Sequence, residues 1–289
     1  MTVAAPLRVG SMTKSVVAVV VQELSDEARL DLDAPIESFK LGVDIPPAIT
    51  VRQLLDHTSG LPDYVDEPGY LDVSLTTPGR VWQPSELVEI AMTREIEDEP
   101  GARFKYTSAG YVVLGLLIES IEHRPLGDVL HDRILGPHGM AASVLATGIA
   151  CPAVVSGWEI VDAEGRVGDV SGLLHPSGAW AAGALVSTAS DLAAFYQDFA
   201  VGTDRAWASR AVDTGSELSP RYRAGFLSRE TALGECWGHD GRVPGYAGWG
   251  MHCATADTTV VVLQNHNSPE LEQIVGAIIG VLALDSDAA

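Results

Sequence analysis

Long apolar runs, separated by short polar stretches rich in proline and glycine, dominate the first two thirds of this 289-residue chain. Residues 12–24 are almost wholly apolar around Val16–Val21, which predicts a buried helix, although the β-branched valines leave a strand open. Residues 108–122 have apolar side chains at helical spacing, which predicts a second helix. Shorter helices are expected at 51–55, from about 85 to before Pro100, at 126–134 and at 190–199.

The last third of the chain has the pattern of β-structure. Consecutive antiparallel strands are predicted at 235–243, 246–255 and 258–266, followed by an amphipathic C-terminal helix. A hairpin is predicted over 154–170, whereas the proline-rich segment 62–84 is predicted to be loop. The fold class is therefore α+β, with a sheet covered by helices. We expect a single domain over 1–289, mostly helical at about 12–200 and β-rich at about 220–289.

The charge of the chain excludes two classes of partner. A net charge of −21 and a sequence pI of about 4.5 would repel nucleic acid and anionic lipid surfaces.

Residues 1–10 contain Arg8 and lack the apolar core of a signal peptide, and no apolar run approaches the length of a membrane span. The sequence leaves the location of the protein open.

Ser11 and Lys14 stand three residues apart at the start of the first apolar run, so a helix would place them on one face. A hydroxyl becomes a nucleophile near neutral pH beside a base, and lysine can be that base where burial favours its neutral form. The valine run after Lys14 would supply this burial. The alternative is a plain helix start that is capped by a serine and has no chemistry.

Two further motifs carry reactive side chains, Tyr106-Thr107-Ser108 and His239-Asp240-Gly241. With Ser11-Met12-Thr13-Lys14, and in this order, they resemble the motifs of the serine β-lactamase and penicillin-binding family. The variant is similar to the branch of class C β-lactamases, soluble D-alanyl-D-alanine carboxypeptidases, D-aminopeptidases and related esterases. Residues 54–62, 111–119, 183–192 and 239–246 resemble further family stretches, so the resemblance covers most of residues 7–266.

The resemblance implies a β-lactamase/transpeptidase-like fold, with an antiparallel sheet flanked by helices and a mostly helical region. It also implies four catalytic roles. Ser11 would attack a carbonyl group and form an acyl-enzyme, and Lys14 would take its proton. Tyr106, if its pKa is lowered by Lys14, would relay the proton to the leaving group. His239 would maintain the electrostatic environment of this proton relay.

Neighbouring residues are expected to bind the substrate. Gly241 would let the substrate backbone approach the strand edge, and the backbone N–H groups of Ser11 and Arg242 would form an oxyanion hole. Ser108 replaces the asparagine that is usual in this branch, and its short hydroxyl would hold a substrate amide less well. Asp240 would repel a substrate carboxylate, for which Arg242 could compensate, or it would hold a substrate ammonium group.

Two local features have a structural interpretation. The segment His57–Gly60 imitates a His-x-x-Gly site, but the family pattern makes it a turn. The cysteines Cys151, Cys236 and Cys253 have neither the spacing of a disulfide framework nor that of a zinc site, so each is expected to be a small buried apolar residue. If the last hairpin turns at Pro244-Gly245, however, Cys236 and Cys253 face each other across neighbouring strands and could be joined.

The start of the chain departs from the family. A helix and two sheet strands normally precede the Ser-x-x-Lys motif, whereas ten residues precede it here. We expect either that the true start lies upstream or that the protein is truncated, with an open sheet edge and exposed apolar surface.

The expected function is serine hydrolysis through an acyl-enzyme, of the D-alanyl-D-alanine carboxypeptidase type first. A carboxylesterase, a β-lactamase and a D-aminopeptidase are the enzymatic alternatives, and a truncated, non-catalytic ligand-binding member is the alternative outside enzymes. The expected partner is a small-molecule or peptide substrate, such as a D-Ala-D-Ala-like peptide, an ester or a β-lactam. Neither a metal nor an organic cofactor is implied.

Overall fold

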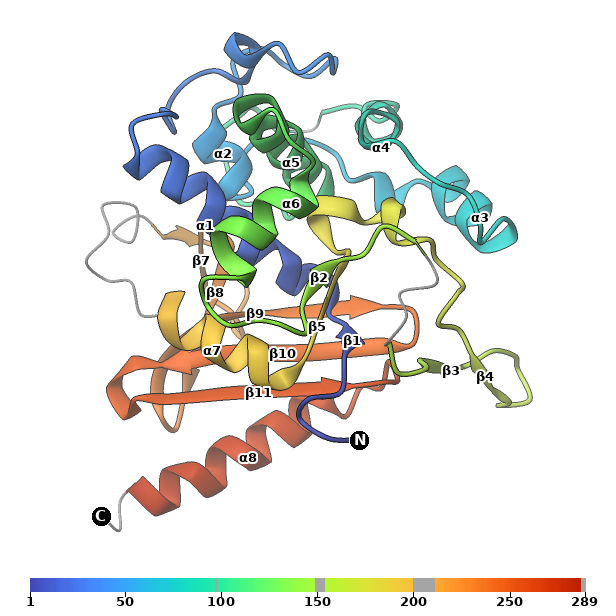
Figure 1. Cartoon of the computed structure of the whole chain (residues 1–289), viewed down its shortest axis with the longest axis vertical. Coiled ribbons are helices and arrows are strands. Elements are labelled where there is room, and N and C mark those ends of the chain that lie inside the picture. Colours follow the sequence, from blue (N-terminus) through green and yellow to red (C-terminus); the bar gives the residue numbers. More distant parts are fainter. Residues whose placement is uncertain (97, 149–153, 200–210, 287–289) are drawn as a thin grey trace.

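A six-stranded antiparallel sheet with helices on both faces organises the computed structural model (Figure 1). The structure describes residues 1–96, 98–148, 154–199 and 211–286. The helices are α1 (Thr13–Asp26), α2 (Val51–Leu55), α3 (Pro68–Thr76), α4 (Pro84–Ala91), α5 (Ser108–Glu122), α6 (Leu126–Leu130), α7 (Ala189–Phe199) and α8 (Leu271–Ser286). The strands are β1 (Leu7–Arg8), β2 (Val144–Leu145), β3 (Trp158–Ile160), β4 (Val167–Asp169), β5 (Leu185–Ser187), β6 (Val212–Asp213), β7 (Arg221–Arg223), β8 (Phe226–Thr231), β9 (Gly234–Val243), β10 (Tyr246–Cys253) and β11 (Thr258–Gln264).

The strand order of the large sheet is β11-β10-β9-β8-β7-β6. Within it, half of the inner strand β9 is unpaired on one side. β10 pairs with β9 along residues 236–243, whereas β8 pairs with β9 only as far as Gly238. Residues 239–243 therefore have β10 on one side and no neighbour among the described strands on the other. The short 3-10 helix η1 (Gly10–Met12) packs against this open half, which brings the start of α1 to the sheet.

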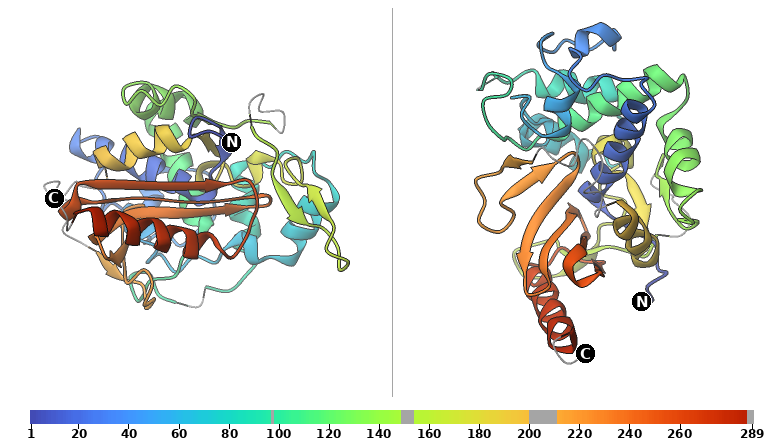
Figure 2. Two further views of the ribbon diagram at one scale, coloured as in Figure 1. Left: turned by 90° about the horizontal axis from the view of Figure 1, so that it is seen from below. Right: turned by 90° about the vertical axis from the view of Figure 1, so that its left-hand side faces the viewer.

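The two faces of β10 pack against different helices, and its alternating sequence explains why. The larger side chains, among them Trp249 and Met251, form a small core with α8. Gly248 and Gly250 point to the opposite face, where a Cβ on Gly250 would lie 2.6 Å from the Tyr196 ring of α7. The view from below in Figure 2 shows α8 and α7 on opposite faces of the sheet.

Burial decides the conformation of the first apolar run. Every residue of Val16–Val21 is fully buried in α1, in the core between the sheet and the helical layer. A valine costs at most about 0.7 kcal/mol of helix propensity. Its full burial contributes about 1.5–3 kcal/mol. The predicted helix is therefore confirmed, and the strand alternative is excluded.

The other predicted elements have mixed outcomes. The helices at 51–55, 108–122 and 190–199, the hairpin within 154–170, the three last strands and the C-terminal helix are confirmed. The helix that begins near Ser85 ends at Ala91, well before Pro100, and the predicted loop 62–84 contains α3. Pro68 opens α3 at its first turn, where the missing N–H of proline costs nothing, so the proline marked a helix start and not a loop.

The edge strands of the large sheet are β11 and β6. β1 pairs with β5 in a separate three-stranded sheet. Within the described ranges, no helix has both the length and the apolar character that crossing a membrane requires.

Cys236 and Cys253 are joined by a disulfide, so the interpretation of these two cysteines as unpaired apolar residues is corrected. They lie opposite each other in the β9–β10 register with a Cα–Cα distance of 4.0 Å, and both are fully buried. The bond ties together the strand that carries His239 and its neighbour. Cys151 lies outside the described residues.

We predict that replacing both bonded cysteines by alanine lowers the free energy of unfolding by about 3 kcal/mol, because the unfolded chain loses a crosslink. The crosslink spans a sequence separation of 17 residues. Chemical denaturation with and without a reductant measures this effect, and only the wild-type protein should respond to the reductant. Three reactive thiols per denatured, oxidised chain would contradict the disulfide.

Candidate active site

Ser11 and Lys14 meet at the junction of η1 and α1. Lys14 is fully buried, and its Nζ donates hydrogen bonds to Ser11 Oγ at 3.0 Å and to the Ala182 carbonyl oxygen at 2.9 Å. The three-residue spacing places both side chains on one side of the first turn, as predicted. A serine hydroxyl in contact with a buried amine is the arrangement that nucleophile activation requires.

The environment of Lys14 favours its neutral form. Burial lowers the pKa of its ammonium group from 10.5 to about 8, while the carboxylates of Asp63 and Asp240 act in the opposite direction. Asp63, which the sequence reasoning missed, is itself buried and accepts a hydrogen bond from the Ser108 backbone N–H at 2.7 Å. An amine with a pKa near 8 can accept a proton at mildly alkaline pH.

Tyr106 lies in the extended segment before α5, with a side-chain hydrogen bond to Ser11. The Lys14 Nζ lies 4.9 Å from the centroid of its ring. Although Tyr106 is 36% exposed along the cavity, desolvation of its hydroxyl group raises the pKa of the phenol well above 10, and the hydrogen bond to Ser11 offsets only part of this rise. The condition set for its relay role, a pKa lowered by Lys14, is therefore not met. Tyr106 is a neutral phenol, suited to donating a proton.

The imidazole ring of His57 packs against the ring of Tyr106. Their ring centroids lie 4.2 Å apart, and the Thr107 backbone N–H donates to His57 Nδ1 at 3.2 Å. Since Nδ1 accepts this hydrogen bond, Nε2 carries the proton and donates it to the Tyr222 hydroxyl at 3.1 Å. Burial lowers the pKa of His57 well below 6.5, so the ring is neutral and the expected structural role agrees with its surroundings.

His239, which is expected to maintain the electrostatic environment of the relay, is also neutral. Burial lowers its pKa to about 4, although the neighbouring Asp240 carboxylate opposes the shift. Its Nδ1 lies 2.5 Å from the Asp240 carbonyl oxygen, which can only accept, so Nδ1 carries the proton. The buried Nε2 has no hydrogen-bond partner among the described residues and presents a lone pair.

Two glycines let η1 approach the open half of β9. A Cβ on Gly241 would overlap the Val9 carbonyl oxygen, and a Cβ on Gly10 would lie 2.7 Å from the Arg242 backbone nitrogen. Gly241 thus makes room for the protein's own backbone, whereas the sequence assigned that room to a substrate. The close approach brings the backbones of Ser11 and Arg242 to one wall of a cavity, as the predicted oxyanion hole requires.

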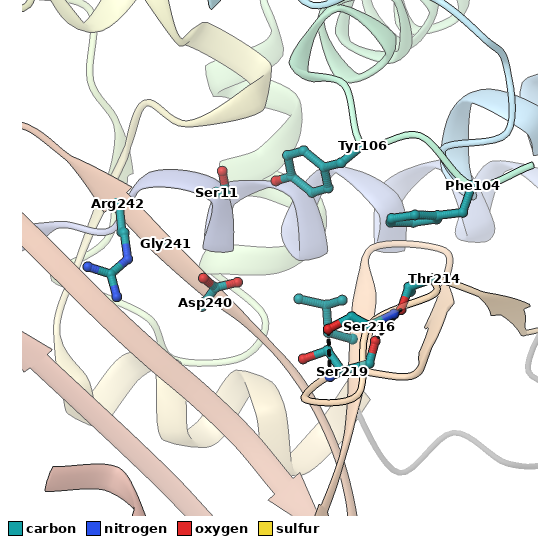
Figure 3. Close-up of a pocket in the computed structure, with 10 residues that line it drawn as sticks. Ser11, Phe104, Tyr106, Thr214, Ser216, Ser219, Asp240, Gly241 and Arg242 are labelled. Atoms are coloured by element: carbon teal, nitrogen blue, oxygen red, sulfur yellow. Dashed lines mark hydrogen bonds between the residues drawn. The ribbon is translucent and has the colours of Figure 1, made fainter. Parts of the chain in front are cut away.

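The cavity has a volume of about 380 Å³ (Figure 3). Its lining comes from the motifs and from the loop between β6 and β7: Ser11, Phe104, Tyr106, Thr214, Ser216, Ser219, Leu227, Asp240, Gly241 and Arg242. Asp240 alone among these bears a carboxylate, and Arg242 alone a positive charge. Arg242 Nη1 donates to Asn267 Oδ1 at 2.9 Å.

Several predicted residues lie behind the cavity wall, and several lining residues were not predicted. Lys14, His239 and Ser108 are buried and do not line the cavity. Phe104 could have been found, because alternate residues of an extended segment share a face and Tyr106 is two positions away. The lining residues of the 214–219 loop carry no motif.

The described residues contain no group of three or more His, Cys, Asp or Glu that could hold a metal ion.

A model of the beta-lactamase family matches residues 1–283. The chain is 28% identical over 231 residues to a D-aminopeptidase of Cereibacter sphaeroides, which covers 77% of this chain and 43% of that protein. It is 30% identical over 209 residues to protein Rv1367c of Mycobacterium tuberculosis, with 65% of this chain and 52% of that protein covered. The chain thus spans about half the length of these relatives.

Two solved structures extend the similarity to nearly the whole chain. The D-amino acid amidase of Ochrobactrum anthropi SV3 superposes with a TM-score of 0.85 at 26% identity, covering 100% of this chain and 87% of that one. The D-stereospecific amidohydrolase of a Streptomyces species superposes with a TM-score of 0.80 at 29% identity, covering 91% and 83%.

We predict that acylation of Ser11 by a nitrophenyl ester speeds up with pH through a titration near 8, because the reaction requires neutral Lys14. Asp63→Asn should shift this titration to lower pH, since the lost carboxylate stabilised the ammonium form. Asp26→Asn, at the far end of α1, is the matched control and should leave the profile in place. A profile that Asp63→Asn does not move would contradict the electrostatic account.

We also predict that Gly241→Ala slows acylation by roughly 100-fold or more, the usual cost of losing one oxyanion-hole donor. The added methyl group would push Val9 and the Ser11 backbone away from β9. Gly79→Ala is the control, because a Cβ there meets nothing within 4 Å. Circular dichroism checks that both variants fold, and full activity of a folded Gly241→Ala protein would exclude this oxyanion hole.

Proposed function

Because the chain belongs to the beta-lactamase family, a family of serine hydrolases, we propose that it hydrolyses amides of D-amino acids through an acyl-enzyme on Ser11. The single observation that carries this choice is the Asp240 carboxylate in the wall of the cavity that also contains Ser11 and Tyr106. The D configuration of the substrate rests on the names of the similar proteins, a D-aminopeptidase and a D-amino acid amidase.

In the proposed reaction, neutral Lys14 takes the proton of the Ser11 hydroxyl as Oγ attacks the substrate carbonyl carbon. The negative oxygen that forms accepts hydrogen bonds from the Ser11 and Arg242 backbone N–H groups. Tyr106 donates its proton to the leaving nitrogen, the carbon–nitrogen bond breaks, and the Lys14 ammonium returns a proton to Tyr106. Water then attacks the ester by the same route in reverse and releases the amino acid.

The charge of the cavity wall favours an ammonium group on the substrate. Asp240 has a side chain that is 40% exposed, so it is available to a ligand. A carboxylate here attracts the free ammonium group of an amino acid amide and repels a carboxylate on the leaving group. This supports a D-aminopeptidase or amidase over the D-alanyl-D-alanine carboxypeptidase that the motifs alone suggested, since a carboxypeptidase releases an amino acid with a carboxylate.

A carboxypeptidase-type activity is the second candidate, and Arg242 is the observation that favours it. Its guanidinium group lines the same cavity and could bind a carboxylate. Its hydrogen bond to Asn267 leaves further N–H donors on the guanidinium fork. A time course of intact mass with a penicillin separates the two candidates, because a lasting adduct on Ser11 would favour the carboxypeptidase type, whereas a fleeting one with drug consumed would indicate a β-lactamase.

We predict that the enzyme hydrolyses D-alanine amide faster than D-lactamide, in which a hydroxyl replaces the ammonium group, by about 10- to 100-fold in kcat/KM. This is the range expected for a hydrogen bond to a charged group. Asp240→Asn should remove most of this preference. The lost carboxylate also lowers the pKa of Lys14, but this effect is common to both substrates and leaves their ratio unchanged. Ser11→Ala should abolish both reactions. Equal turnover of the two substrates by the wild-type enzyme would refute the role of Asp240.

A further inference from the structure

Helix α8 carries apolar side chains all around its axis. Between Gln273 and Asp285 its sequence consists only of isoleucine, valine, leucine, alanine and glycine. One side of the helix is buried against the sheet through Leu271, Val275 and Ile279. The other side is 37–73% exposed at Ile274, Ile278, Val281 and Leu284. A helix that is apolar all around is normally buried on every side, so the exposed side of α8 is suited to a contact with another molecule.

The edge strand β11 is next to this helix and is open to pairing. β10 pairs with all of Thr258–Gln264 on one side, and no described strand pairs with these residues on the other. Beyond the strand, His266 forms a β-bridge with Trp158, so the open edge is confined to β11 itself. The strand contains neither a charged residue nor a proline, the residue types that usually prevent pairing at a sheet edge.

Strand and helix form one surface, which we call the β11–α8 surface and define as residues 258–264 and 274–284. α8 packs against β10 and β11, and Figure 1 shows α8 and β11 at the same side of the molecule. Neither segment contains a charged residue. The Glu272 carboxylate at the start of α8 forms an ion pair with Arg229 at 2.5 Å. The surface is therefore apolar and uncharged, and the backbone groups on its outer edge are used by no other described strand.

The charge of the chain determines what can cover this surface. With a net charge of −21, copies of this protein repel each other wherever their charged surfaces meet. An uncharged surface avoids this repulsion, so two copies can approach closely there. A basic partner, by contrast, gains no attraction from a surface that carries no carboxylate. The chemistry that fits is a second apolar, uncharged surface with an open strand edge, and a second copy of the chain supplies one.

We infer that the β11–α8 surface binds the same surface of a second copy, related by a two-fold axis perpendicular to the sheet. Such an axis pairs the two β11 strands antiparallel. Centred on Val261, it pairs all seven residues, with Val260 opposite the partner's Val262. Val260 and Val262 both pack on the α8 side of the sheet, so paired side chains lie on the same face, as the pleat requires. The two α8 helices then lie on one face of a continuous sheet.

The same geometry limits the assembly to two copies. Among the described strands, the other edge of the large sheet is β6, which has only the two residues Val212–Asp213 and includes a charge. Pairing through β11 uses the long edge of each copy, so a closed dimer forms and not a fibre. None of the described residues of β11 or α8 lines the active-site cavity, so this contact is independent of the proposed reaction.

Val281→Glu tests this contact, because Val281 is 61% exposed on α8 and a two-fold interface contains the substitution twice. Sedimentation velocity should show a wild-type dimer that dissociates on dilution. Val281→Glu should raise its dissociation constant at least about 100-fold, since two valines lose their burial and two carboxylates are brought together. Val167→Glu is the matched control, with the same change at a valine that is 64% exposed on β4. It should dimerise like the wild type, and both variants should hydrolyse a nitrophenyl ester at the wild-type rate.

Hydrogen–deuterium exchange tests the strand pairing separately. In the wild-type protein, the amides of residues 258–264 should exchange more slowly as the protein concentration rises, because pairing adds hydrogen bonds on the open edge. In Val281→Glu, their exchange should not depend on concentration. A wild-type dimer whose β11 amides exchange at one rate at all concentrations would overturn the paired arrangement.

A wild-type protein that stays monomeric at every concentration would overturn the second copy as the occupant. Sedimentation with vesicles of phosphatidylcholine then tests a lipid surface in its place. A monomer that binds these vesicles through α8 should lose the binding in Val281→Glu and keep it in Val167→Glu. That result would assign the β11–α8 surface to lipid and not to a second copy.

Discussion

Burial of the Lys14 amine against the Ser11 hydroxyl is the constraint on which the rest of the site depends. An amine with no exposed surface loses its hydration, and this loss lowers its pKa to about 8. The carboxylates of Asp63 and Asp240 limit the shift, so the group stays close to its titration point at mildly alkaline pH. The apolar helix α1 supplies the burial, and the same valine run that drives folding therefore prepares the nucleophile.

The other parts of the site are arranged around this pair by elements far apart in the chain. The open half of β9 lets η1 approach, and Gly10 and Gly241 leave room for the contact. His57 fixes the backbone beside Tyr106, whose neutral phenol is then a proton donor and not a base. The two protonation states are complementary, since the amine accepts a proton near the pH at which the phenol still holds one.

The sequence predicted those features that depend on local spacing. The three-residue spacing across the junction of η1 and α1 brings Ser11 and Lys14 together. Tyr106 and Asp240, which line the same cavity as Ser11, were expected from the resemblance of their motifs to the family. Protonation states could not be predicted, because the neutral His239 and the high pKa of Tyr106 follow from burial by distant segments. The part of the cavity lining that comes from residues 214–219 was missed for another reason, since this loop carries no pattern of its own.

The most direct test of this account is an NMR titration of Lys14 in the intact protein. The chain has only three lysines, so ¹³C-labelled lysine gives few signals, and Lys14→Arg assigns the one that matters. The account predicts that Lys14 titrates near pH 8 and that Asp63→Asn moves this value downward. Titration of Lys14 near 10.5, the ordinary value of the amine, would mean that it remains an ammonium group at working pH and cannot activate Ser11.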